Sequence, residues 1–260
     1  MKMKKNILIA ILLLNTVMSF AQYNGGSGSG FVSGSSTAVT LSAFLQGPYS
    51  SGSMTTTLNT NNFIPLSQPY NTSPWNYTGT ETVGSIPAGV VDWVLIELRR
   101  NTADSSTIQK RAAFILNDGT ITDIDGTSPI NFYSAGDISS YYVVIRHRNH
   151  LAVMSANSLS LTSSLSGSYL TGGNSEYDFS TAQTQAFGTN PMFDLGSGVL
   201  GMRSGDSNNS NIVTFSDVSG IISNNNQTGY NSNDINMSGI VTFADVSQII
   251  SNNNSSTQVP

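Results

Sequence analysis

The end of the chain contains an internal repeat, and this repeat limits the fold more than any other feature. Segments 206–217 and 234–245 read DSNNSNIVTFSD and DINMSGIVTFAD, and each is followed by an apolar stretch that ends in Ser-Asn-Asn-Asn. After residue 198 the chain has only four acidic side chains, which occupy the first and last positions of the two segments. Acids that only kept a surface soluble would be scattered. The repeat therefore predicts two equivalent loops, each with an acidic centre.

Each loop offers only hard oxygen ligands. Positions 1, 3, 5, 7 (backbone carbonyl) and 12 are Asp206, Asn208, Ser210, Ile212 and Asp217 in the first copy, and Asp234, Asn236, Ser238, Ile240 and Asp245 in the second. Calcium takes six to eight oxygens, and 12-residue loops supply them from these positions, often with a water at position 9. The sequence predicts two Ca²⁺ sites, and two carboxylates per loop favour weak affinity, about 10⁻⁵ to 10⁻³ M. The alternative is a polar turn duplicated without metal.

Three further features of the repeat bear on its backbone and packing. Gly239 and Asn211 occupy position 6, where the loop turns sharply, and Asn is the next best residue after Gly for a left-handed backbone. Thr214 and Thr242 occupy position 9. Apolar residues then follow at i, i+3, i+6 and i+7, which predicts one apolar face on each of two short helices that pack together: Phe215, Val218, Ile221 and Ile222, repeated as Phe243, Val246, Ile249 and Ile250.

Segment 205–254 resembles a dockerin on these motifs, with two loop–helix repeats, Asp at position 12 and no helix before the first loop. The resemblance implies that calcium folds the module and that its helix faces bind a cohesin partner. Family members that bind cohesins usually carry small hydroxyl residues at positions 10 and 11. This chain has Phe215-Ser216 and Phe243-Ala244 there, and the Phe residues favour core packing.

The first residues predict export. Lys2, Lys4 and Lys5 precede an apolar run at 7–20, and small residues precede Gln22, so residues 1–21 read as a signal peptide that is too short to span a membrane. Its removal changes the net charge from −5 to −8, which argues against a nucleic-acid partner. There is no cysteine, which excludes a lipid anchor on cysteine and disulfide bonds. We expect a protein that is secreted, extracellular or on the outer cell surface, without a transmembrane segment.

The middle of the chain predicts a β domain. Residues 22–38 are Gly/Ser-rich and read as a linker, residues 39–198 contain short apolar runs separated by Pro, Gly and Asn, and residues 199–256 form the dockerin-like module. Long strands are expected at 89–100, apolar on both faces, and at 141–154, and 117–120 predicts a hairpin turn. The fold class predicted is mainly β, an antiparallel β-sandwich followed by a small helical module.

The same domain carries a second resemblance, in segments 44–49, 64–70, 91–99 and 146–155. Together they are similar to an uncharacterised domain found near the C-terminus of large secreted surface proteins of Gram-negative bacteria, where it commonly precedes dockerin-like repeats. This family implies no settled activity.

One charged cluster and four aromatic residues are the remaining candidates for function. Strand alternation would separate His147 and Asn149 from Arg146, Arg148 and His150, so an ion-pair network with Glu97 is favoured over catalysis. Asp92 and Glu97 would point to opposite faces, unlike a glycosidase pair. The loop aromatics that are candidates for stacking on a sugar, or for plugging the end of a sandwich, are Tyr49, Tyr70, Trp75 and Tyr77.

The sequence therefore predicts a non-enzymatic binding or scaffolding protein with no catalytic residues. Its module would bind two Ca²⁺ ions and would either dock a protein partner of the cohesin type or clamp intramolecularly onto the β domain. The first alternative is a carbohydrate-binding accessory protein of a polysaccharide-degrading system, with a glycan ligand. The second is a hydrolase.

Overall fold

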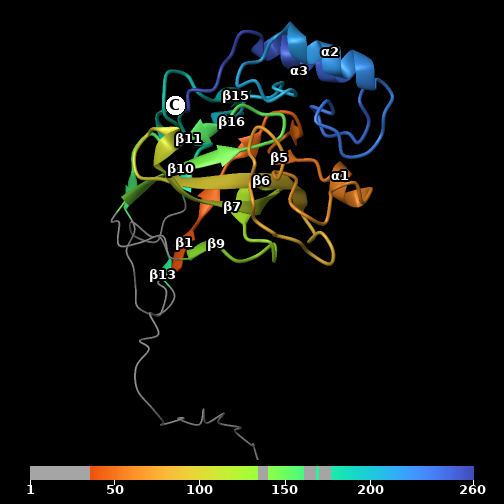
Figure 1. Cartoon of the computed structure of the whole chain (residues 1–260). Coiled ribbons are helices and arrows are strands. Elements are labelled where there is room, and N and C mark those ends of the chain that lie inside the picture. Colours follow the sequence, from red (N-terminus) through yellow and green to blue (C-terminus); the bar gives the residue numbers. More distant parts are fainter. Residues whose placement is uncertain (1–35, 134–139, 161–167, 170–176) are drawn as a thin grey trace, which may run out of the picture. The chain divides into compact units, whose positions relative to one another are not determined.

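The computed structural model describes residues 36–133, 140–160, 168–169 and 177–260, and Gly34–Pro260 form one compact unit (Figure 1). The predicted signal peptide and most of the predicted linker lie outside the described residues. β1 (Ser36–Val39) begins within the range assigned to the linker. Among the described residues, no helix has the length and hydropathy needed to cross a membrane.

The largest sheet is built around β6 (Val90–Arg99), which pairs antiparallel with β7 (Thr107–Leu116) and with β10 (Ser140–Arg146) (Figure 1). The strand order is β11-β10-β6-β7-β8-β2-β14, and β12 also pairs with β10. The shorter strands of this sheet are β2 (Leu41–Ser42), β8 (Thr120–Thr122), β11 (Val153–Met154), β12 (Leu159–Ser160) and β14 (Tyr177–Asp178). Every residue of β6 is buried, which confirms the prediction that both its faces are covered.

Smaller sheets and short helices complete the β domain. One sheet joins β13 (Ser168–Tyr169), β1 and β9 (Ile130–Tyr133), and another joins β15 (Phe193–Gly196), β16 (Val199–Met202) and β3 (Phe44–Leu45). β4 (Tyr49–Ser50) pairs with β5 (Ser53–Met54), and the short helices are α1 (Thr57–Thr60), η1 (Asp104–Ser106) and η2 (Gln183–Gln185). The fold is mainly β, as predicted. Three short pairings, β1–β13, β2–β14 and β3–β16, are parallel, so it is not antiparallel throughout.

The predicted hairpin turn and the second predicted long strand have different outcomes. The hairpin prediction is confirmed, because β7 and β8 flank residues 117–119 and Gly119 has a φ of 93°. The prediction of one long strand over 141–154 is wrong. β10 ends at Arg146, and the chain returns as β11 antiparallel to β10. The intervening backbone instead bonds to residues just before the first loop, because Gly205 N donates to Asn149 O and Leu151 N donates to Arg203 O.

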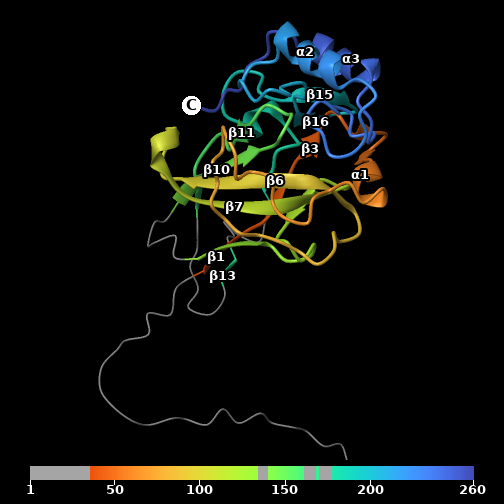
Figure 2. The same cartoon turned by 45° about the vertical axis from the view of Figure 1, so that its right-hand side comes forward.

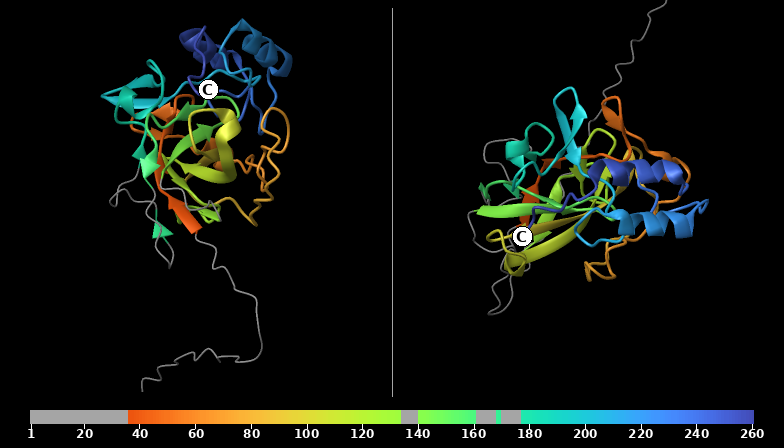
Figure 3. Two further views of the ribbon diagram at one scale, coloured as in Figure 1. Left: turned by 60° about the vertical axis from the view of Figure 1, so that its left-hand side comes forward. Right: turned by 90° about the horizontal axis from the view of Figure 1, so that it is seen from above.

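The two repeats form α2 (Phe215–Asn224) and α3 (Phe243–Asn252), which lie side by side (Figures 2 and 3). Their shared core confirms that the copies pack together, and it contains Val213, Ile221, Ile235, Val241, Ile249 and Leu151 of the β domain. The two copies also exchange backbone hydrogen bonds in a crossed pattern. Each loop pairs with the segment after the other helix, through Val213 with Asn254 and Ser255, and Val241 with Asn226 and Gln227.

The predicted apolar helix face is correct only in part. Ile221 and Ile249 are fully buried, and Val218 and Val246 pack against them. The four other members are 60–66% exposed, and they are Phe215, Ile222, Phe243 and Ile250. At about 100° per residue, Ile221 lies about 120° around the helix from Phe215, whereas Ile222 lies close to the Phe215 direction. An apolar face centred on Ile221 therefore leaves Phe215 and Ile222 outside the core. The prediction that Phe215 and Phe243 pack in the core is wrong.

Candidate calcium-binding loops and the residues that hold them

The first loop folds its oxygen atoms toward one another. Asp206 accepts hydrogen bonds from Ser210 N at 2.8 Å on Oδ1 and from Asn211 N at 3.0 Å on Oδ2. Asn208 Oδ1 accepts from the same Ser210 N at 3.0 Å, and Ser210 Oγ donates to Ile212 O at 3.0 Å. The oxygens of positions 1, 3, 5 and 7 are thus neighbours in one network.

The second loop repeats this network atom for atom. Asp234 accepts from Ser238 N at 3.0 Å and from Gly239 N at 2.8 Å. Asn236 Oδ1 accepts from Ser238 N at 3.0 Å, and Ser238 Oγ donates to Ile240 O at 3.1 Å. The predicted left-handed turn at position 6 is confirmed, with φ of 86° at Gly239 and 69° at Asn211 in the first copy.

The acid at position 12 joins the loop to the helix. Asp217 accepts from Asn208 N at 3.2 Å on Oδ1 and from Thr214 N at 2.9 Å on Oδ2. Thr214 in turn caps α2, so the two residues form a capping box. Thr242 and Asp245 do the same for α3. Sequence reasoning placed the two Thr residues only at a water position and missed this role, although Thr followed three residues later by an acid is a helix-start signal.

Four carboxylates are therefore buried in two like-charged pairs. The exposed fraction is 4% for Asp206 and 0% for Asp217, Asp234 and Asp245. Burial raises the pKa of Asp206 and of Asp234 to about 6 each, and the second acid of each loop adds to the rise. Within the described residues, none of the four forms a salt bridge with Lys, Arg or His.

This donor set fits calcium. No group of three or more His, Cys, Asp or Glu side chains that could hold a metal occurs among the described residues, so each loop depends on two carboxylates, an amide, a hydroxyl and a carbonyl. All of these are hard oxygens, and a divalent cation would balance the two buried charges of each loop. Waters would complete a coordination of six or more.

Residues 148–151 of the β domain contact the second loop and the segment before it. Asn149 Nδ2 donates to Ser232 O and to Asp234 O, both at 3.1 Å. Arg148 Nη1 donates to Asn231 O, and Leu151 enters the shared core of the two repeats. The backbone carbonyl of Asp234, a predicted calcium ligand, is therefore bonded to the β domain. These contacts are between the module and the β domain of the same chain.

A buried polar cluster continues from these residues into the main sheet. Asp92 accepts from Arg148 Nε at 2.8 Å, from Tyr230 Oη at 2.7 Å and from its neighbour Trp93 N at 2.8 Å. His147 Nε2 lies 3.1 Å from the same carboxylate. Burial by itself would raise the pKa of Asp92, but Arg148 and the hydrogen bonds from His147 and Tyr230 lower it to about 2. Asp92 therefore stays charged and ties β6 to the module.

The two histidines form a chain of hydrogen bonds that runs from Gly47 to Asp92. Gly47 N donates to His150 Nε2 at 3.1 Å, so His150 carries its proton on Nδ1, which lies 3.0 Å from His147 Nδ1 and 2.8 Å from Asn149 Oδ1. His147 then carries its proton on Nε2, toward Asp92. Burial lowers the pKa of both rings, so both are neutral. The prediction that strand alternation separates the two rings is wrong, because the strand has already ended. All four ring nitrogens have protein partners, which supports a structural role.

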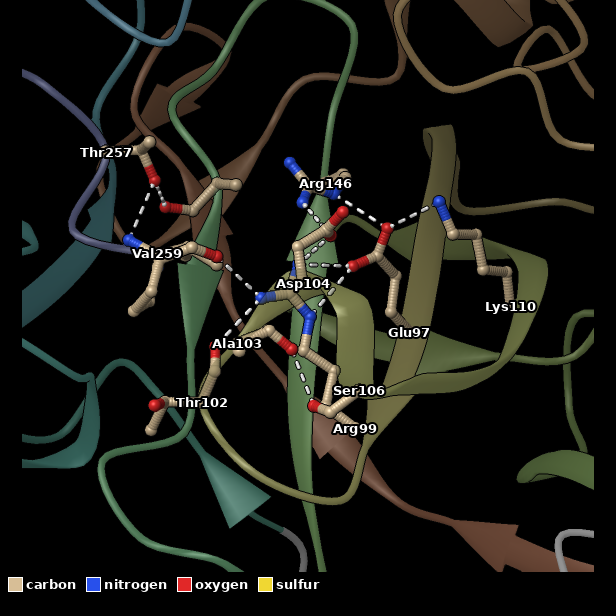
Figure 4. A network of polar contacts seen from close by, with 12 residues as sticks. Glu97, Arg99, Thr102, Ala103, Asp104, Ser106, Lys110, Arg146, Thr257 and Val259 are labelled. Carbon is tan, nitrogen blue, oxygen red and sulfur yellow. Dashed lines mark hydrogen bonds and ion pairs between the residues drawn. The ribbon is translucent and has the colours of Figure 1, made fainter.

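Glu97 organises a second, separate cluster (Figure 4). Its buried carboxylate bonds Arg99 at 2.9 Å, Arg146 at 2.8 Å and Lys110 at 3.1 Å, and Asp104 lies 2.6 Å from Arg99. The predicted ion pair between Glu97 and an arginine of 146–150 is thereby confirmed. Asp92 and Glu97 belong to different clusters and do not face one another across a cavity.

The four candidate aromatics separate into two groups. Tyr70 is fully buried and donates to Trp93 O at 2.7 Å, and Tyr49 packs edge-on against Phe44. Trp75 and Tyr77 are partly exposed and line cavities at the surface. Tyr49 is also partly exposed, but of the four only Trp75 and Tyr77 are in the walls of the described cavities.

The comparisons with known proteins add little. No family model matches the chain, and no curated protein matches it. A chain in the crystal structure of a type II cohesin–X-dockerin complex from Acetivibrio cellulolyticus, an N-terminal interface mutant, is similar with a TM-score of 0.40 and 13% identity, over 84% of this chain and 97% of that chain. Similarity this low carries no functional inference.

Proposed function

We propose that this chain is a secreted, non-enzymatic binding protein whose C-terminal module (residues 199–256) binds two calcium ions. The main support is the identical oxygen network of the two loops. The copies differ at loop positions 2, 4, 6 and 11, yet positions 1, 3, 5 and 12 keep the same oxygen-bearing side chains and the same hydrogen bonds.

Helix capping and turn formation explain this pattern only in part. The capping boxes account for Asp217 and Asp245 at position 12. They do not account for Asp206 and Asp234 at position 1. Each of these carboxylates accepts a backbone hydrogen bond on both of its oxygens, and each adds a second buried charge to its loop. An isolated buried carboxylate is costly, and two facing each other more so, unless a cation is bound.

Calcium in the second loop would also order part of the β domain. Asn149 is completely buried and bonds the carbonyl of Asp234 itself. Arg148 and Asp92 extend this connection into β6. We therefore propose that the module clamps onto its own β domain and that calcium stabilises both parts together.

The partner that we propose is a protein, of the cohesin type that the dockerin resemblance implies. With the inner side of the module packed on its own domain, the outer surfaces of the two helices remain. Each exposes one Phe and one Ile at equivalent positions: Phe215 with Ile222, and Phe243 with Ile250. Single exposed apolar residues are common, but a repeated pair of large ones marks an interaction surface.

Calcium binding is tested by calorimetric titration of the metal-stripped chain without its predicted signal peptide. We expect two sites, loss of one with Asp206→Asn or Asp234→Asn, and no loss with the exposed control Asp194→Asn. At a calcium concentration about 100 times Kd, each site would stabilise the protein by about 2.7 kcal/mol. Absence of both heat and a melting-temperature shift at millimolar calcium would refute the proposal.

Partner binding is tested separately, with a purified cohesin immobilised on a sensor surface. We expect calcium-dependent binding that Phe215→Asp and Phe243→Asp together abolish, while calorimetry still finds two calcium sites in the double variant. No binding by the calcium-loaded parent chain would exclude a cohesin and leave the calcium proposal intact.

A further inference from the structure

Two adjoining cavities lie beside the Glu97 cluster. The first is lined in part by the first calcium loop, and the second is lined by residues of the β domain. The first is about 300 Å³, and its wall includes Trp75, Lys110 and Arg146 together with Asp206 of the first loop. The second is about 430 Å³ and is more open, with Trp75, Tyr77 and Lys110 in its wall. Because Trp75 and Lys110 line both, the cavities meet at these two side chains.

The aromatic part of this surface is held in place. The Trp75 ring packs edge-on against the buried ring of Tyr70, with 5.0 Å between centroids and 90° between planes. The Tyr77 hydroxyl bonds Glu81, which fixes the neighbouring ring. Fixed, partly exposed aromatic rings provide flat apolar surface at low entropic cost, which suits the apolar face of a sugar ring.

The polar part has an excess of unused donors. Lys110 Nζ bonds Glu97 Oε1, and Arg146 bonds it through Nε, so both side chains retain N–H groups beyond these contacts (Figure 4). Their side chains are 28% and 19% exposed. Within the cluster three cations, Arg99 included, face the side-chain carboxylates of Glu97 and Asp104. Arg146 Nη2 lies 3.5 Å from Asp104, and Arg99 also donates to Pro260 O at 2.9 Å, so Lys110 and Arg146 are the cations with N–H groups left at the cavity wall.

The acid of the first loop disfavours an anionic ligand unless its charge is neutralised. Asp206 also lines the first cavity, and its negative charge would repel a carboxylate there. Calcium in the first loop would offset Asp206 together with Asp217. To this extent the inference rests on the proposed function.

We propose that the two cavities together bind a saccharide chain that carries carboxylate groups. One sugar ring lies on Trp75, and the carboxylate of an adjacent uronate residue accepts hydrogen bonds from Lys110 and Arg146. The first cavity, at about 300 Å³, has room for one sugar unit, and the more open second cavity lets the chain continue along Tyr77.

The test is calorimetric titration of the calcium-loaded chain with oligogalacturonate, with cellohexaose as the neutral probe of similar length. We expect binding of oligogalacturonate that is at least about tenfold tighter than that of cellohexaose, and about tenfold weaker in Lys110→Gln, since a hydrogen bond to a charged group contributes about 1.5–3 kcal/mol. Lys110→Arg should restore most of the affinity. The matched control Arg100→Gln, an exposed cation outside both cavities, should leave it unchanged.

The aromatic contact has its own pair of variants. Trp75→Leu should weaken binding severalfold, and Tyr49→Ala, a partly exposed aromatic outside both cavities, should not. Two calcium sites measured in every variant show that the fold and the loops are intact. No binding, equal affinity for both probes, or an unchanged affinity in Lys110→Gln with the calcium sites present would overturn the inference. Absence of calcium binding in the parent chain would overturn the inference as well, because Asp206 would then keep its negative charge at the first cavity.

Discussion

Replacing Asp92 with Asn should destabilise the protein by about 3–5 kcal/mol. Arg148 is 2% exposed, and Asp92 is the carboxylate that it bonds. Removing one partner of a buried ion pair leaves an uncompensated charge, which is the costly change in such pairs. The substitution would also remove one hydrogen-bond acceptor. His147 bonds Oδ2 of Asp92 and Tyr230 bonds Oδ1, and the amide nitrogen that replaces one of these oxygens cannot accept.

The pKa of Asp92 gives an independent measure of the same interaction. Its pKa is lowered from 3.8 to about 2, and each pKa unit corresponds to about 1.36 kcal/mol, so the charged carboxylate contributes on the order of 2–3 kcal/mol to stability. The folded-state pKa lies below the unfolded value. This contribution is therefore complete above about pH 4 and is lost as the pH falls from about 4 to about 2.

Urea denaturation at constant calcium, followed by tryptophan fluorescence, measures both effects. We expect the Asp92→Asn variant to lose stability at pH 7 and to show a smaller further loss between pH 4 and pH 2 than the parent chain. Asp194→Asn, at an exposed acid, is the control for the change in net charge. A loss of less than about 1 kcal/mol at pH 7 would refute the reasoning, because Arg148 would then have another source of compensation.

Three further substitutions test packing and capping by the same denaturation assay. Ile221→Ala should cost about 2–5 kcal/mol, while its exposed neighbour Ile222→Ala should change stability by less than about 0.5 kcal/mol, and equal losses would contradict the corrected helix face. Gly47→Ala should cost about 1–3 kcal/mol, since its Cβ would lie 2.0 Å from the carbonyl oxygen of Ile235, and a neutral result would mean that this interface is looser than described. Thr214→Ala should cost about 1 kcal/mol through loss of the α2 cap, whereas Thr214→Ser should restore most of it.

Local patterns in the sequence predicted the parts of the fold that depend on local physics. Gly239 and Asn211 marked one left-handed position of each loop, because few other residues adopt that backbone without strain. Position 4 is left-handed as well, at Asn209 and Met237, and was not predicted. Apolar residues on both sides of β6 predicted burial on both faces, since neither side was mainly polar. The mainly β class followed from turn signals that need no knowledge of the partner strands.

Contacts distant in sequence decided the parts that the sequence could not predict. His147 and His150 were assigned to opposite faces, because alternation assumes that a strand continues. The strand ends at Arg146 since the backbone of 149–151 bonds residues more than 50 positions away. The exposure of Phe215 and Ile222 was missed for a related reason. The apolar spacing defined a face wider than the partner helix covers, and only the packed structure shows where that face ends.

The crossed pairing of the two repeats is the arrangement of a two-fold symmetric dimer joined into one chain. Val213 bonds the segment after α3, and Val241 bonds the equivalent segment after α2, so each copy supplies what the other lacks. Two identical copies could exchange the same contacts, because a surface related by a two-fold axis is complementary to itself. A single 28-residue repeat therefore carries both halves of this crossed pairing, and a second copy of it could supply the complementary half.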